Sequence, residues 1–488
     1  MLFSGSGVET ETGVSGPYTF QIGNVGSVGV AAGSPFAPGA PMGVASEPPR
    51  SAAAKFDAGL RRSEAALAVE GTPAAAGAPS GPVVAPPVGD QRTFQVCSTS
   101  TCKATTTVNA TARAVGQTVA IYADDANPVF ADTLQGDDYA EMVAIFDSHL
   151  YPIGTAAFGD PSDIDNNGVV LILISKRVND FTTNCTDGRV IGYFYGGDLL
   201  TTFAGSNKAE VFFTFAPAPA AGNCSAISRR TALNQLKPTL IHEFQHMISF
   251  NQHRLVRSGS QEETWLNEGL SHLAEDLAGQ LIPNEHCPGS SSCRSLFSTA
   301  NVSNAHSYWV DPTRHALVYG ESSNGSLPER GAGLLFTRWL LDQHGSGENG
   351  FNLTRALVAT NRVGMANIEA VTSQGFPLLA GQWLMTGYID DLPGFTDPSG
   401  TLAFDTWDFR TVMNNPANSG LFPGGFPLRP EVLTVAASRS GELKAGTGRY
   451  FLLRPGGTAQ ELLLSGVSGS PNQPDPSLLA RLALIRIQ

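Results

Sequence analysis

His242, Glu243 and His246 have the residue types and spacing needed to hold a metal ion and to use it in a reaction. They form an HExxH pattern inside a largely apolar stretch. Residues four apart lie on the same face of an α-helix, so both imidazoles can reach one ion. The glutamate beside the first histidine can then accept a proton from a metal-activated water. The pattern predicts a helix that carries two zinc ligands and the general base of a hydrolysis.

A zinc site of this kind needs a third protein ligand and leaves the fourth position open to water. The longer pattern HExxHxxGxxH is absent, because Ser249 and Gln252 stand where it has Gly and His. His253 can share the helix face, but the first two ligands already occupy its metal-facing turn. Glu268, which lies 22 residues after His246, opens a second helical pattern with an apolar stripe. We therefore expect Glu268 to be the third ligand.

At these residues the chain resembles a known family. HEFQHM at 242–247, followed by WLNEGL at 265–270, is similar to the hyicolysin-like metallopeptidases, which are gluzincins like thermolysin and the zinc aminopeptidases. The resemblance extends loosely over residues 94–345. It implies a thermolysin-like zincin fold, zinc bound by His242, His246 and Glu268, and Glu243 as the general base.

Two departures from the thermolysin pattern concern the helix that carries Glu268. Thermolysin-type enzymes have an Asp four residues after the ligand Glu, where this chain has His272. Glu275 instead resembles the acidic residue of the aminopeptidase pattern, and two helical turns place it on the same side as Glu268, where it could support a ligand. The aminopeptidase signature that grips a free amine is absent upstream of HExxH, which disfavours an exopeptidase.

The resemblance also implies a donor that stabilises the oxyanion formed during peptide hydrolysis. Gluzincins generally supply a Tyr or His downstream of the third ligand, where this chain offers Tyr308, Arg314, His315 and Tyr319. Related proteins have a Tyr almost directly before a Gly-Ala pair, but Glu329 and Arg330 precede Gly331-Ala332 here. Tyr319 is the candidate donor, and a buried aromatic residue is the alternative interpretation.

The composition indicates an exported protein that does not bind nucleic acid. The chain has 488 residues, 15% of them charged, and a net charge of −13, whereas phosphate binding needs clustered Lys and Arg. No apolar run is long enough to span a membrane. The first residues lack the basic start and apolar core of a signal peptide, so we expect a trimmed signal or a misplaced start codon. We expect a secreted protein, most simply a monomer.

Six cysteines are present and none forms a CxxC pair, so a second zinc site or a redox motif is disfavoured. Cys97 with Cys102 and Cys287 with Cys293 are near enough in sequence to close small loops, which leaves Cys185 with Cys224. This is one of fifteen connectivities, chosen by proximity, and six free thiols remain the alternative.

Composition shifts divide the chain into four parts. Residues 1–32 read as an N-terminal β segment, and residues 33–90 as a linker rich in Pro, Ala and Gly. Within the linker, Phe56, Leu60 and Leu67 have the spacing of a short amphipathic helix, which is either the remnant of a propeptide or, as we favour, a docking arm. Residues 91–395 form the predicted peptidase domain, and residues 396–488 contain evenly spaced strand patterns typical of a small β-sandwich.

Several elements of the peptidase domain can be predicted from their patterns. Strands are expected at 93–96, 105–114, 119–122 and 169–175, and a helix at 139–150. The apolar run at 210–215 is expected to be the strand at the edge of the cleft, where it could pair with an extended substrate. The catalytic helix can begin before Leu233, and Pro238 predicts a kink or a new start.

Asp163, Asp165 and Asn167, followed by Gly168, match the first half of a calcium-binding loop. The twelfth position is Ile174 rather than Glu, so the loop is not an EF-hand. Another segment would have to complete the shell, with the Val169 carbonyl as a further ligand. A polar turn before the next strand explains the same residues equally well.

These patterns predict an α+β protein: a thermolysin-like zincin catalytic domain with an N-terminal β segment and linker and a C-terminal β-sandwich-like domain. The function they favour is that of a secreted zinc endopeptidase acting on protein or peptide substrates. A catalytically silent surface or adhesion protein that retains its zinc site is the first alternative, and a zinc exopeptidase is the second. Retention of Glu243 disfavours the silent protein, because a structural zinc site is normally closed and needs no base.

Overall fold

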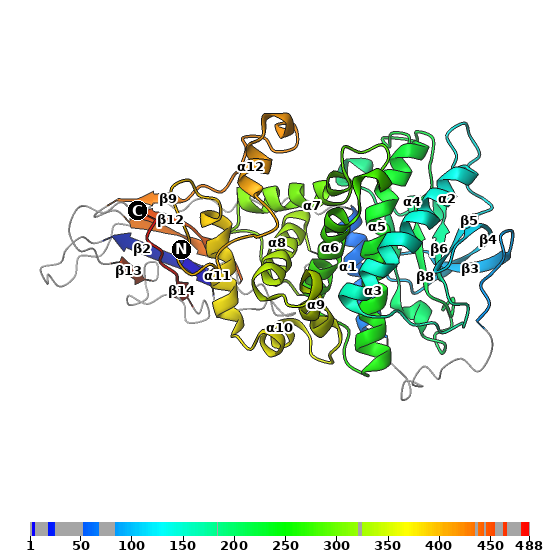
Figure 1. Cartoon of the computed structure of the whole chain (residues 1–488), viewed down its shortest axis with the longest axis horizontal. Helices are drawn as coiled ribbons and strands as arrows, with labels where there is room; N and C mark the ends of the chain where they lie inside the picture. Colours follow the sequence, from blue (N-terminus) through cyan, green and yellow to red (C-terminus); the bar gives the residue numbers. More distant parts are fainter. Residues whose placement is uncertain are drawn as a thin grey trace, which may run out of the picture.

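The structure is a computed structural model of the whole chain. It describes residues 2–4, 18–24, 52–67, 83–182, 184–320, 325–434, 438–443, 446–453, 462–465 and 480–487. Within these ranges it is a mixed α+β protein, as the sequence predicts. Figure 1 shows a sheet at one end, a helical middle, and strands from both termini at the other end.

A six-stranded mixed sheet has the order β3-β4-β5-β6-β8-β7. Its strands are β3 (Gln91–Cys97), β4 (Thr105–Val115), β5 (Val119–Asp124), β6 (Val170–Ile174), β7 (Gly192–Phe194) and β8 (Val211–Thr214). The pairs β5–β6 and β6–β8 are parallel, and the other pairs are antiparallel. Every residue of β5, β6 and β8 is buried, as expected for central strands with both faces covered. The strands predicted before residue 176 are thus confirmed.

The prediction that 210–215 forms the edge strand is wrong. Strand β8 lies between β6 and β7, and β7 is the edge. Tyr193 of β7 is opposite Phe213 of β8 in an antiparallel pair. The sequence misleads here because β7 is only three residues long, too short to leave a clear hydrophobic pattern, whereas the apolar run of β8 is conspicuous.

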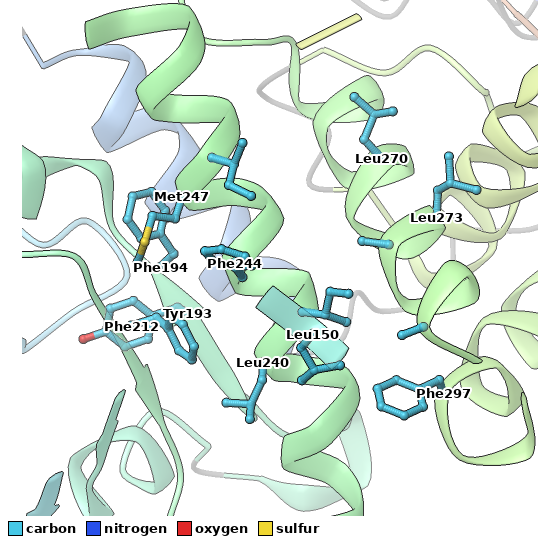
Figure 2. Packing of buried hydrophobic residues seen from close by; sticks show 14 of the residues in the cluster. Leu150, Tyr193, Phe194, Phe212, Leu240, Phe244, Met247, Leu270, Leu273 and Phe297 are labelled. Atoms are coloured by element: carbon cyan, nitrogen blue, oxygen red, sulfur yellow. The ribbon is translucent and has the colours of Figure 1, made fainter. Parts of the chain in front are cut away.

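Two long helices carry the HExxH and Glu268 motifs, and the first of them packs beside this sheet. They are α5 (Arg229–Phe250) and α6 (Thr264–Leu281), and they pack against each other. Figure 2 shows Phe244 and Met247 of α5 near Phe194, with Leu270 and Leu273 on α6. Both helices bury apolar side chains on either side of their polar motif residues, so the motifs are held by a packed core.

The other helices and short helical turns complete the described part of the catalytic region and its C-terminal extension. The α-helices are α2 (Gly136–Ile145), α3 (Tyr151–Phe158), α4 (Lys176–Asn179), α7 (Cys293–Val310), α8 (Leu327–His344), α9 (Phe351–Val358), α10 (Gly364–Thr372), α11 (Phe376–Ile389) and α12 (Phe409–Asn414). Two π-helical turns are η1 (Phe146–Leu150) and η4 (Asn251–Val256). The 3-10 turns are η2 (Cys185–Asp187), η3 (Gly196–Leu199), η5 (Asn284–His286), η6 (Glu348–Gly350) and η7 (Pro416–Asn418). The predicted helix at 139–150 is therefore α2 continued by η1.

The short helix predicted within the linker is α1 (Ala52–Ala65). Phe56 and Leu60 are buried, whereas Lys55 is exposed. Figure 1 shows α1, in blue, beside α6 and α5 in the middle of the molecule. The remaining linker residues at 33–51 and 68–82 lie outside the described residues.

Strands from the two ends of the chain pair with each other. Strand β1 (Leu2–Ser4) lies between β11 (Gly448–Arg449) and β14 (Ala480–Leu482), and β2 (Tyr18–Asn24) lies between β10 (Ser438–Leu443) and β13 (Leu462–Ser465). Strand β12 (Phe451–Leu453) pairs with β9 (Glu431–Leu433). Most of the C-terminal strand predictions are thereby confirmed. We propose that they form the predicted sandwich-like domain, completed by the N-terminal strands, and the domain boundaries stay predictions.

Three disulfides join Cys97 to Cys102, Cys185 to Cys224 and Cys287 to Cys293. The connectivity predicted from proximity is confirmed. Among the described residues, no helix is both long and apolar enough to cross a membrane.

Candidate metal centre

Helix α5 presents the HExxH residues from a fixed, buried position. Its N-terminus is capped by the Ser228 hydroxyl, which accepts a hydrogen bond from the Thr231 N–H. The helix continues through Pro238 instead of starting anew there. Residues from Leu240 to Phe250 are all buried, so the motif is surrounded by protein on every side of the helix.

His242, His246 and Glu268 converge in one buried cluster, as the sequence predicts. Glu268 is in the first turns of α6 and is 1% exposed. The two Nε2 atoms are 3.2 Å apart, and His246 Nε2 is 3.2 Å from Glu268 Oε1. His242 Nε2 is 3.6 Å from Glu268 Oε2. The two imidazoles and the carboxylate therefore face a single point.

These separations fit a zinc ion. Two ligand atoms of a tetrahedral zinc, each about 2.0–2.1 Å from the ion, lie about 3.3 Å apart. In addition, the Glu268 carboxylate is buried and faces both imidazoles. A buried carboxylate beside two histidine nitrogens is a typical ligand set for zinc. The triad thus has the donor types and spacing of a zinc site.

Arg330 is a functional neighbour that the sequence reasoning missed. It lies at the start of α8, and its Nη1 is 2.9 Å from Glu268 Oε2. Although burial alone would raise the pKa of Glu268, the charges of Arg330 and His246 hold that pKa well below its usual range. Glu268 is therefore an anion. The signal in the sequence that could have pointed to Arg330 was its position directly before the Gly331-Ala332 pair.

Glu275 orients His242 from the side opposite the triad. Its Oε1 accepts hydrogen bonds from His242 Nδ1 at 2.7 Å and from His272 Nδ1 at 2.9 Å, while its Oε2 accepts one from Asn301 Nδ2 at 3.0 Å. A carboxylate on Nδ1 leaves Nε2 free to bind a metal and raises the basicity of the ring. Burial alone would lower the pKa of His242, but Glu268 and Glu275 raise it to about 10. The supporting position predicted for Glu275 is confirmed.

His242, His272 and Glu275 also lie close enough together to be considered as a metal site. Both contacts of Glu275 Oε1 with the imidazoles are of hydrogen-bond length, however, and they use Nδ1 of His242. We interpret this second cluster as a hydrogen-bond network that holds His242 of the triad in place.

Glu243 is placed between the triad and the edge strand β7. Its Oε2 accepts a hydrogen bond from the Phe194 N–H at 2.7 Å. Burial raises the pKa of Glu243 to about 7, against the lowering effect of His242 and Arg61. A carboxylate whose pKa is close to neutral is well suited to exchange protons at that pH.

The residues considered as oxyanion donors lie in different surroundings. Tyr319 is buried and its hydroxyl lies against Gly325, whose carbonyl accepts a hydrogen bond from Arg330 Nε. Tyr308 is also buried, but its ring stacks on Trp383. Arg314 is bound to Asp311 in an ion pair on the surface. Only Tyr319 of these three is thus connected to the Arg330–Glu268 pair.

Two further residues considered from the sequence, His253 and His315, are in other elements than α5 and α6. His253 is in the π-helical turn after α5, and its Nε2 is 3.9 Å from Glu262. His315 is half-buried in the loop between α7 and α8. The preference for Glu268 over His253 as third ligand therefore agrees with the geometry.

A separate group of carboxylates lies at the loop before β6. Possible ligand atoms of Asp163, Asp165 and Glu210 lie within 4.8 Å of one another. Glu210, which the sequence reasoning missed, is 1% exposed, and its Oε2 has no hydrogen-bond partner in the described residues. Asn167 instead closes the turn, since its Oδ1 accepts from the Val169 N–H and its Nδ2 donates to Asp165. Arg92 Nη1 is 3.1 Å from Asp165 and partly neutralises the group.

The comparisons with known proteins agree with this site. No family model matches the chain. The chain is 28% identical over 293 residues to the neutral metalloprotease ShpI of Staphylococcus hyicus. The match covers 54% of this chain and 61% of the relative, so the chain spans less than two thirds of the relative's length. This distant homology confirms the resemblance found from the HEFQHM and WLNEGL motifs.

Proposed function

We propose that the chain is a zinc-dependent endopeptidase that cleaves internal peptide bonds. The observation that carries this proposal is the buried triad of His242, His246 and Glu268 beside the carboxylate of Glu243. A structural zinc site would have four protein ligands and no need of an adjacent base. Homology to a neutral metalloprotease supports the same reaction class.

Each residue of the site has its own role in hydrolysis. Zinc, when bound, supplies a Lewis acid that polarises the scissile carbonyl and lowers the pKa of water. Glu243 accepts the proton of the attacking water and returns it to the leaving amine. The Phe194 N–H holds the Glu243 carboxylate in place, and Glu275 fixes the orientation of His242. Burial of all these groups strengthens their electrostatic effects.

We propose Tyr319 as the donor that stabilises the oxyanion. Its hydroxyl is buried, without a hydrogen-bond partner in the described residues, and its pKa is raised well above the usual range, by burial first and then by the charge of Glu268. A neutral hydroxyl without a partner can donate to a developing negative charge.

The variant Tyr319→Phe should therefore lower kcat by about 10²–10³-fold while KM changes little, because the hydrogen bond is made mainly in the transition state. Steady-state kinetics on a fluorogenic peptide measures both constants. Tyr308→Phe is the matched control, since it removes another buried hydroxyl without a hydrogen-bond partner in the described residues, from a ring that stacks on Trp383. Equal rates for the wild type and Tyr319→Phe would exclude this role.

We also propose that Asp163, Asp165 and Glu210 bind calcium, with Asn167 or the Val169 carbonyl as the further oxygen ligands considered from the sequence. The buried, unpaired Glu210 oxygen supports a cation here, because carboxylate oxygens are the ligands that calcium prefers. Glu210 supplies the missing acidic ligand that the half-loop lacks.

Calcium should raise the melting temperature of the wild type at pH 8, by an amount corresponding to about 2.7 kcal/mol at a hundredfold excess over Kd. Burial raises the pKa of Glu210 to about 7. The folded state therefore holds this proton more tightly than the unfolded chain, stability falls as pH rises toward 7, and calcium binds best above 7. Glu210→Gln should abolish the calcium effect, whereas Glu285→Gln, an exposed control, should retain it. The same calcium shift in all three proteins, measured by calorimetry, would refute the site.

Secretion is part of the proposal. Three disulfides form and persist most readily in an oxidising, extracytoplasmic environment. An extracellular protease would act on protein or peptide substrates. The silent surface protein and the exopeptidase are the alternatives that an activity measurement must separate.

The proposed function is tested by incubating the purified chain with casein, with and without a chelator, and again after zinc is restored. We expect internal fragments that disappear with the chelator and return with zinc. Absence of cleavage in a chain shown by metal analysis to hold zinc would favour the silent protein.

A further inference from the structure

Helix α1 places charged side chains against the edge strand next to the metal centre. Arg61 and Glu64 are 3% and 1% exposed, and they form an ion pair in which Arg61 Nη1 is 2.6 Å from Glu64 Oε2. Arg61 Nη2 donates to the Phe194 carbonyl at 3.2 Å, and the Gly196 N–H donates to Glu64 Oε1 at 2.6 Å. Phe194 is also the residue whose N–H binds Glu243.

The two main-chain groups that α1 uses are those that an extended peptide would need. Phe194 ends β7 and Gly196 begins η3, but Tyr195 between them is still extended (φ −124°, ψ 111°). The Phe194 carbonyl and the Gly196 N–H therefore point to the same side of the chain, as they would in a strand. A peptide strand added to that edge would donate an N–H to the first and offer a carbonyl to the second. The Arg61 guanidinium takes the place of that N–H donor, and the Glu64 carboxylate takes the place of that carbonyl.

The same side of α1 also reaches the metal centre, because Asp57 lies one turn before Arg61 and pairs with it at 3.3 Å. Asp57 Oδ2 is 2.5 Å from Arg330 Nη2, and Arg330 is the residue paired with Glu268. The ring of Phe56 packs on Phe181 at 4.4 Å and on Tyr193 of β7 at 5.2 Å between centroids. Helix α1 thus covers the outer edge of β7, the apolar surface formed by Phe181 and Tyr193, and Arg330 beside the third ligand.

We propose that α1 is a built-in competitor of the substrate that occupies the cleft and must leave it before a peptide can bind. This inference rests on the proposed endopeptidase function. Helix α1 is held at the edge strand by hydrogen bonds of its side chains, whereas a substrate would use its main chain. The helix therefore presents no extended peptide bond that the edge strand could align for cleavage. By sequence, Pro-, Ala- and Gly-rich stretches flank the helix on both sides, a composition typical of linkers.

Two variants of the full chain should displace α1 while the zinc ligands, Glu243 and Tyr319 all remain in place. Arg61→Ala with Glu64→Ala removes both hydrogen bonds to the edge. Asp57 loses its contact with Arg61 in this variant but keeps its ion pair with Arg330. Gly59→Leu acts by steric exclusion, because a Cβ at Gly59 would lie 2.6 Å from Ser100 Oγ and 2.8 Å from its Cβ. Lys55→Ala, an exposed change on the same helix, is the control.

The initial rate of cleavage of an internally quenched peptide, blocked at both ends, should rise about tenfold or more in both variants, since each charged hydrogen bond is worth a factor of roughly ten. Lys55→Ala should equal the wild type. Hydrogen exchange should increase in residues 52–67 of the variants, and a synthetic peptide covering 51–67 should inhibit them competitively. Unchanged rates in variants whose α1 exchanges freely would overturn the proposal and make α1 a structural element only.

Failure of the inference can be distinguished from failure of the proposed function. If no form cleaves the peptide although zinc is bound, the endopeptidase function fails. The position of α1 is then tested alone by adding a peptide hydroxamate, which binds zinc and extends along the cleft. Increased exchange in residues 52–67 would support competition for the cleft, and unchanged exchange would overturn it.

Discussion

Glu243→Gln should lower kcat/KM for peptide hydrolysis by about 10²–10⁴-fold while zinc stays bound, because the amide cannot accept the proton of the attacking water. The amide keeps an oxygen that can accept the hydrogen bond from the Phe194 N–H, so the local structure should persist. Steady-state kinetics together with metal analysis of the same samples measures both properties. Unaltered activity in a zinc-loaded variant would contradict the role of Glu243.

The pH profile provides an internal check on this assignment. Burial raises the pKa of Glu243 to about 7, and a base works only when it is unprotonated. The kcat/KM of the wild type should therefore rise with pH along an acid limb at or below about 7, since the positive charge of zinc favours the carboxylate. The residual activity of Glu243→Gln should lack that limb.

Glu268→Gln should lose zinc and, with it, activity. The carboxylate is the third ligand in our account, and its charge offsets that of the ion. Glu275→Gln keeps all three ligands and weakens only the support of His242, so its zinc affinity should fall by the smaller factor of about 10–100. Competition with a fluorescent zinc chelator ranks the affinities as wild type, Glu275→Gln and then Glu268→Gln.

Glu285→Gln serves as the control for removal of a single carboxylate, because Glu285 is exposed and lies in η5, outside the motif helices. Its zinc affinity should match that of the wild type. If Glu268→Gln bound zinc as tightly as this control, the triad would not be the metal site, and the cluster of His242, His272 and Glu275 would replace it.

The parts of the structure that could be predicted from the sequence are those encoded by local patterns. The HExxH spacing and the start of the next helix sufficed to bring His242, His246 and Glu268 together, because a helix fixes which residues share a face. The disulfides between near neighbours and the α1 helix follow from similarly short separations. The buried strand β6 was recognisable from its continuous apolar run.

Contacts between distant segments account for what the sequence reasoning missed. The pairing of β2 with β10 and β13 joins the two ends of the chain, and no local pattern encodes it. Arg330 and Glu210 become site residues only because the fold places them beside Glu268 and Asp163. The contact between Arg61 and Phe194 spans 133 residues and depends on a strand of three residues. Side chains that act through such contacts can be found only when the fold is known.

The central claim is that the triad and Glu243 hydrolyse internal peptide bonds. The most direct test is mass spectrometry of a peptide blocked at both ends, incubated with the zinc-loaded Arg61→Ala/Glu64→Ala chain and with the same chain that also carries Glu243→Gln. We predict cleavage at internal bonds by the first and a loss of about 10²–10⁴-fold in the second. No internal cleavage by the zinc-loaded first chain, or equal cleavage by both, would contradict the account.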